Sequence, residues 1–242
     1  MPFRQLPNTD ASTYEALRAA KAKADSVDPA DLAFPVALQE KLNTFLPAFG
    51  KEVNERGAAL SVQSEATKLR TAAQEKCKMY VSHFYQVFNF GISRGEYKAT
   101  ERGYFQVDIS NESVPEIKTE SDLIRAANNI VNGEQQRTAA GCKKMENPSA
   151  DEVKLALDDY NAVLADQSGK KDIYQKEQED VDKLRPEALE LVKDIWDEIE
   201  FKLRKDEPSV MRRKAREYGV VYVARTGEEP DEDTAADDEP AV

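Results

Sequence analysis

The chain is poor in the residues that most catalytic and metal sites use. Among 242 residues it has one histidine, His83, and two cysteines, Cys77 and Cys142. One histidine and the absence of any Cys-x-x-Cys pair argue against a zinc site, and two distant cysteines cannot form a disulfide framework. No GxxxxGK[ST], GxGxxG or HExxH motif occurs. We therefore predict no cofactor, no metal and no catalytic residue, and a protein that is not an enzyme.

Glycine and long apolar runs are also scarce. Ten glycines leave few positions for the positive-φ turns that β-rich and phosphate-loop folds need. The most apolar stretch, 80–92, is too short for a membrane span, and the first residues show no secretory signal. A net charge of −12 disfavours nucleic-acid binding. These absences predict a soluble, cytoplasmic helical protein, with unconventional export left open.

Charged residues make up 33% of the chain. The apolar residues that lie between them recur with the period of a helix. A capping box at Ser12–Glu15 predicts a first helix over 10–26, ended before Pro29. Apolar residues then recur at steps of three and four from Phe34 to Val87, and a stop follows at Gly91 and Gly95. A second capping box, Ser149–Glu152, starts another such stripe that runs to Leu203. Pro47 and Pro186 would kink or break these two long helices.

The two long stripes predict the fold class. Both become weakly apolar near their middles, around 55–75 and 165–180. Antiparallel pairing in which partner positions sum to about 243 brings these middles together and places Ala66 opposite Glu177. We expect an all-α protein, an elongated antiparallel helical bundle of coiled-coil type built on two long helices.

The connection over 95–148 is long enough to form a small subdomain. Residues 104–109 alternate apolar and polar side chains, which predicts a strand that pairs with a second strand at 220–224. A short helix over 121–131, entered at Thr119 or Ser121, would end at Asn132–Gly133. We expect one domain over 1–226. Residues 227–242 hold eight acidic residues and no aromatic, which predicts a disordered tail.

Basic residues gather just before this acidic tail. Residues 202–216 contain seven Lys or Arg against two acidic residues. With the tyrosine that follows, they would bind phosphate or an acidic partner. Basic side chains also favour helix C-termini, so a solvated or intramolecular role is the simpler interpretation. The candidate partner-binding residues are Arg212, Arg213, Lys214, Arg216 and Tyr218.

Aromatic residues gather around the single histidine. A pocket between helices near this segment would be lined by Tyr80, His83, Phe84 and Phe88. Such rings more often form core, and we expect His83 to be a hydrogen-bonded structural residue.

Three functional hypotheses follow. The first is a non-enzymatic helical scaffold or protein–protein interaction module that binds an unknown protein partner or a second copy of itself. The second is a small-molecule-binding bundle with the aromatic pocket near Tyr80–Phe88. The third is recognition of a phosphate-bearing or acidic partner by the basic segment 202–216.

Overall fold

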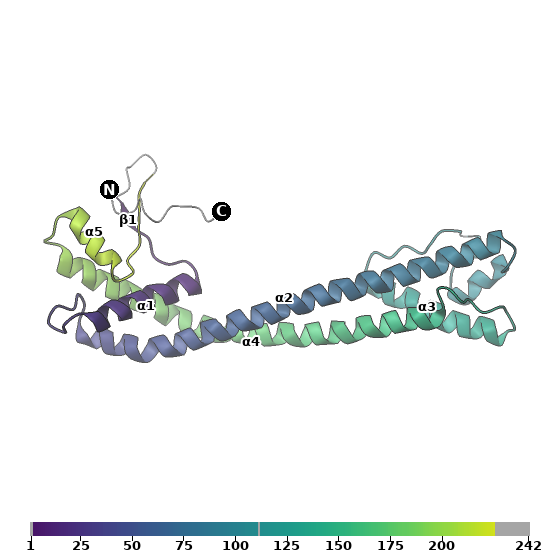
Figure 1. The fold of residues 1–242 in the computed structure, drawn as a ribbon, viewed down its shortest axis with the longest axis horizontal. Coiled ribbons are helices and arrows are strands. Elements are labelled where there is room, and N and C mark those ends of the chain that lie inside the picture. Colours follow the sequence, from purple (N-terminus) through teal and green to yellow (C-terminus); the bar gives the residue numbers. More distant parts are fainter. Residues whose placement is uncertain (1, 111, 226–242) are drawn as a thin grey trace. The chain divides into compact units, whose positions relative to one another are not determined.

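The structure is a computed structural model and describes residues 2–110 and 112–225 (Figure 1). It is mostly helical, at 74%, and the long helices α2 (Val36–Ser93) and α4 (Ala150–Leu203) pack together, as the sequence predicts. The predicted tail over 227–242 lies outside the described residues. Within the described ranges, no helix has an apolar stretch of the length that a bilayer crossing requires.

The chain divides into two compact units. Unit 1 comprises Met1–Leu60 and Tyr174–Val242, and unit 2 comprises Ser61–Ile173. Both long helices contribute to each unit. The connection 95–148 lies wholly in unit 2.

Helix α1 (Asp10–Ser26) has the predicted bounds but a different cap. Thr9 is the N-cap: its Oγ1 accepts a hydrogen bond from the Ser12 backbone N–H at 3.1 Å, and the Ser12 Oγ accepts one from the Thr9 N–H at 3.1 Å. The predicted cap at Ser12 was wrong because Ser12 fills the third helical position of this box. An acidic residue, Asp10, in the first turn also favours a helix that begins directly after Thr9.

Pro47 and Pro186 lie inside α2 and α4, and neither breaks its helix. Both prolines are exposed, as are Asn43 and Asp182 four residues earlier. A proline leaves the carbonyl four residues before it without its helical donor. On the exposed face water can satisfy that carbonyl, so the helix continues.

The register of α2 and α4 differs from the prediction. Lys41 pairs with Glu187 at 3.7 Å in unit 1, and Lys76 pairs with Asp159 at 3.1 Å in unit 2. These positions sum to 228 and 235, so the predicted sum near 243 was wrong.

Unit 2 is completed by a 3₁₀ helix, η1 (Ala99–Phe105), and by α3 (Glu120–Ala139). The Phe105 ring packs edge-on against Phe84 and Phe88, with centroids 5.3 and 5.0 Å apart. The predicted strand over 104–109 was therefore wrong: its apolar alternation serves a helical turn that buries Phe105 under α2.

Helix α3 starts after Thr119, one of the two predicted entries, but continues past the predicted stop at Asn132–Gly133. A Cβ on Gly133 would lie 2.5 Å from the Tyr104 carbonyl oxygen. This glycine therefore allows η1 to pack closely on α3 and does not end the helix.

Unit 1 is completed by α5 (Pro208–Arg216) and by a short ribbon of β1 (Phe3–Arg4) and β2 (Tyr222–Val223). The strands are antiparallel, with Phe3 opposite Val223 and Arg4 opposite Tyr222. The prediction of a strand near 220–224 was confirmed, but its partner is the N-terminal segment and not 104–109. One face of the ribbon is fixed to α4, because Arg4 and Tyr222 both bond to Glu200, at 3.1 and 2.6 Å.

Candidate functional site

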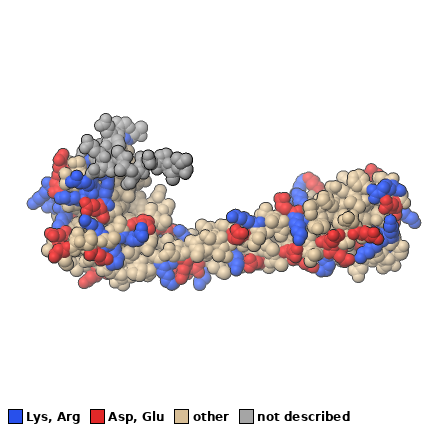
Figure 2. All heavy atoms as spheres, in the orientation of Figure 1, with Lys and Arg blue, Asp and Glu red and all other residues tan. Residues whose placement is uncertain are grey.

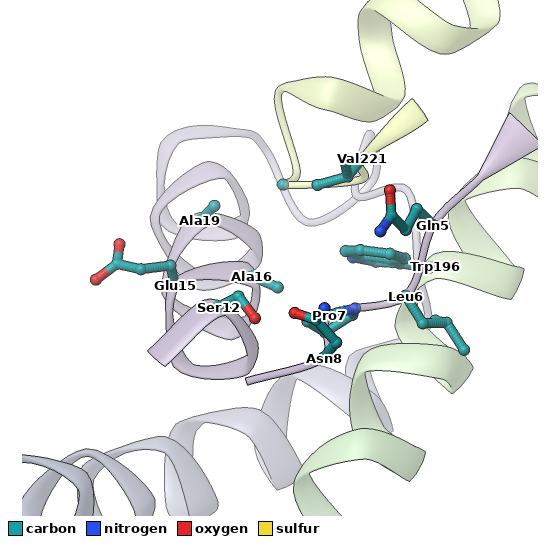
Figure 3. Close-up of a pocket in the computed structure, with 11 residues that line it drawn as sticks. Gln5, Leu6, Pro7, Asn8, Ser12, Glu15, Ala16, Ala19, Trp196 and Val221 are labelled. Atoms are coloured by element: carbon teal, nitrogen blue, oxygen red, sulfur yellow. The ribbon is translucent and has the colours of Figure 1, made fainter. Parts of the chain in front are cut away.

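Unit 1 contains a hollow of about 580 Å³ between α1, the segment after β1 and the segment before β2 (Figure 3). We call it the unit 1 groove. Figure 3 shows α1 on one side and residues 5–8 with the Trp196 ring on the other. The groove is lined by Gln5, Leu6, Pro7, Asn8, Ser12, Glu15, Ala16, Ala19, Trp196, Gly219 and Val221.

Small residues and one left-handed turn create this groove. Gly219 has φ +84°, and a Cβ there would lie 2.8 Å from the Ala19 Cβ. Because Ala16 and Ala19 carry only a methyl group, the chain before β2 passes close to α1. The Trp196 side chain, 1% exposed, closes the groove from the α4 side.

The lining is mostly apolar and lies beside the ribbon. Leu6 and Val221 remain 44% and 49% exposed, although both line the groove. The Gln5 N–H donates to the Val221 carbonyl at 2.9 Å, which extends the ribbon to the groove edge. Glu15 points away from the hollow in Figure 3 and pairs with Arg18 at 2.6 Å. The groove therefore suits an apolar group held next to extended backbone.

The residues of the predicted basic site differ in their environments. Tyr218 is 5% exposed and packs edge-on against Phe34, with centroids 6.1 Å apart. Arg212 is 7% exposed, Lys214 donates to Asp206 at 2.8 Å, and the Arg216 guanidinium lies 5.8 Å from the Tyr222 ring centre. Arg213 is exposed. Blue and red atoms lie side by side over this part of unit 1 in Figure 2, and phosphate or acidic-partner recognition stays a prediction.

The predicted aromatic pocket residues also differ in environment. Phe84 and Phe88 are 0% and 1% exposed in the core of unit 2, and Tyr80 is half-buried. His83 is exposed and makes no hydrogen bond to another described residue, so the expected structural bond is absent there. A hollow of about 250 Å³ nearby is lined by Tyr85 and Phe105, and by none of the four predicted residues.

Three carboxylates of unit 1, Glu52, Glu177 and Asp180, lie within 4.8 Å of one another. Two of these carboxylates bond lysines: Lys51 donates to Glu52 at 3.1 Å, and Lys183 donates to Asp180 at 2.7 Å.

Cys77 and Ser93, two residues whose side chains could act as nucleophiles, lie in environments that do not favour that reaction. Burial raises the pKa of the Cys77 thiol to about 11, so it is protonated at neutral pH. A G-x-S-x-G motif was not expected around any serine, but residues 91–95 read Gly-Ile-Ser-Arg-Gly, which has the spacing of the α/β-hydrolase nucleophile motif. In those enzymes the serine follows a strand. Here Ser93 is the last residue of α2 and its Oγ donates to the Asn89 carbonyl at 3.2 Å.

The sequence alone did not predict the groove. Its lining comes from segments more than 200 residues apart in the chain, and no spacing rule joins them. The usable signals were the small residues of α1 and Gly219. No family model, curated protein or solved structure matches the chain.

Proposed function

We propose that the chain is a non-enzymatic helical interaction module, and that the unit 1 groove receives a bulky apolar side chain from an extended segment of a partner protein. The observation that carries this proposal is the groove itself: an apolar hollow that remains open at exposed Leu6 and Val221. An exposed apolar surface of this kind is a common mark of a binding site.

The adjoining ribbon supports an extended partner. A two-stranded ribbon has two edges whose outward backbone groups can pair with a third strand. The hollow lies at the end of this ribbon, on the face that carries Gln5 and Val221. An added strand would thus bring alternate side chains over the groove. The polar lining offers only amide and hydroxyl groups near its centre, which favours an apolar side chain over a charged small molecule.

The sole tryptophan allows a direct test. Extended peptides selected from a random displayed library against the full chain would share a bulky apolar residue and change the fluorescence of Trp196. Val221→Ser would weaken their binding about tenfold, because it removes apolar contact from the lining. Val36→Ser is the matched control, since Val36 is 52% exposed in unit 1 but does not line the groove.

Two results would overturn the proposal. One is a library selection that yields no peptide sharing an apolar residue. The other is a set of peptides whose binding responds equally to Val221→Ser and Val36→Ser.

A further inference from the structure

Helix α2 carries, within unit 2, a row of exposed residues whose apolar members lie outside the core that α2 forms with α4 and α3. Val62, Leu69 and Met79 are 49%, 53% and 44% exposed. Between them lie Glu65 and Lys76, with side chains 63% and 50% exposed, and an exposed alanine. We call this row the α2 stripe; its members are Val62, Glu65, Leu69, Ala72, Lys76 and Met79.

The spacing of the α2 stripe is that of a coiled-coil seam. Its members follow one another at steps of 3, 4, 3, 4 and 3, the a and d positions of a heptad. The buried side of the same helix is separate: it is formed by Ala66, Cys77, Val81 and Phe84, which are at most 4% exposed. Helix α2 therefore has one buried seam and a second, exposed seam, of which Lys76 also pairs with Asp159 of α4.

The α2 stripe is complementary to a second copy of itself that runs in the opposite direction. Read from either end, Val62 corresponds to Met79, Glu65 to Lys76, and Leu69 to Ala72. We propose that a second copy of this chain packs its α2 stripe antiparallel on the first, about a twofold axis midway between Leu69 and Ala72. A twofold interface requires this self-complementarity, because each contact occurs twice. The paired stretch would be about 26 Å long.

Charges on both sides of the seam fit the same register. Glu65 would face Lys76 of the second copy. Beside the stripe, Lys68 would face Glu75 of the second copy, and both side chains are exposed. Within one chain, Lys68 lies 3.6 Å from Glu65 and Lys76 lies 3.1 Å from Asp159. Such exposed pairs contribute little and can rearrange at little cost.

The first test is the mass of the full chain in solution. Sedimentation equilibrium should show a concentration-dependent dimer. Leu69→Glu places two charges next to the axis and should raise the dimer Kd at least tenfold. Ile109→Glu is the matched control, because Ile109 is 49% exposed in unit 2 and lies outside the stripe. A chain that is monomeric at all concentrations, or a dimer that both variants weaken equally, would overturn the proposal.

The second test fixes the register and the orientation. Glu65→Lys should weaken the dimer, and Glu65→Lys with Lys76→Glu should restore it, with circular dichroism showing unchanged helix content. In a background of Cys142→Ser, a mixture of Val62→Cys chains and Met79→Cys chains should form a disulfide dimer that neither variant forms alone, because the two copies of either residue would lie about 25 Å apart along the axis. A disulfide between two Val62→Cys chains would indicate parallel packing and overturn the proposal. Neither test involves the unit 1 groove.

Discussion

Replacing Arg137 should destabilise unit 2 more than any surface change, because Arg137 is fully buried between two carboxylates. Its Nε and Nη2 donate to Glu134 at 2.9 and 3.1 Å, and its Nη1 donates to Glu101 at 2.6 Å. Nη2 also donates to the Lys143 carbonyl at 2.6 Å. This one side chain therefore joins α3, η1 and the segment before α4.

Arg137→Met keeps much of the volume but removes the charge and every donor. Glu101 and Glu134 would then lie near each other, buried and without a cation, although Glu134 would still accept the Met145 N–H, now at 2.7 Å. Removing one partner of a buried ion pair costs about 3–5 kcal/mol. Adding Glu134→Gln removes one stranded charge and should recover about 1–2 kcal/mol.

Urea unfolding followed by two signals measures this loss. Trp196 reports on unit 1 only, whereas circular dichroism follows the helices of both units. In Arg137→Met the dichroism should begin to fall at a lower urea concentration than the fluorescence changes. Arg125→Met is the control, because Arg125 lies on the same helix with its side chain 66% exposed and should cost less than about 1 kcal/mol. A loss below about 1 kcal/mol for Arg137→Met would refute the reasoning.

Three further predictions concern other buried groups. Hydrogen bonds from Arg185 hold the pKa of Asp10 below its ordinary value, so Asp10→Asn should lower the free energy of unfolding by about 2 kcal/mol at pH 7. The stabilisation by the Asp10 carboxylate is present above about pH 4 and is lost as the pH falls further. The free energies of unfolding of the variant and the parent should therefore converge when unfolding is measured at decreasing pH. Gly133→Ala should destabilise by about 1–3 kcal/mol in thermal unfolding, despite the better helix propensity of alanine, because its Cβ would contact the Tyr104 carbonyl; a more stable variant would contradict this contact. Cys77 should react with a thiol reagent at pH 8 only as fast as unit 2 opens, whereas rapid labelling of both cysteines would show that it is not buried.

Local sequence patterns predicted the helices, because helix formation depends on neighbours three and four residues apart. The bounds of α1 and the capping box at Ser149 were confirmed, the latter by the Glu152 carboxylate, which accepts the Ser149 N–H at 2.7 Å. Pro47 and Pro186 stayed undecided at the sequence level, since their effect depends on which face of the helix meets water.

Packing between distant segments was not predictable in the same way. The alternation in 104–109 fits a strand, but Phe105 is held by rings of α2 that no local rule places above it. From the sequence alone, Gly133 is interpreted as a helix stop. The structure shows instead that it lies against the Tyr104 carbonyl. The unit 1 groove depends on the same kind of contact, between Gly219 and α1.

The pairing of β1 with β2 also sets an order of events during synthesis. Unit 2 is one continuous stretch of chain, so all its residues are available before the second half of α4 has been made. Unit 1 is discontinuous, and Phe3 can pair with Val223 only after residue 223 has been synthesised. The first 60 residues therefore leave the ribosome with apolar surface on α1 and α2 that later residues such as Trp196 and Ile199 cover.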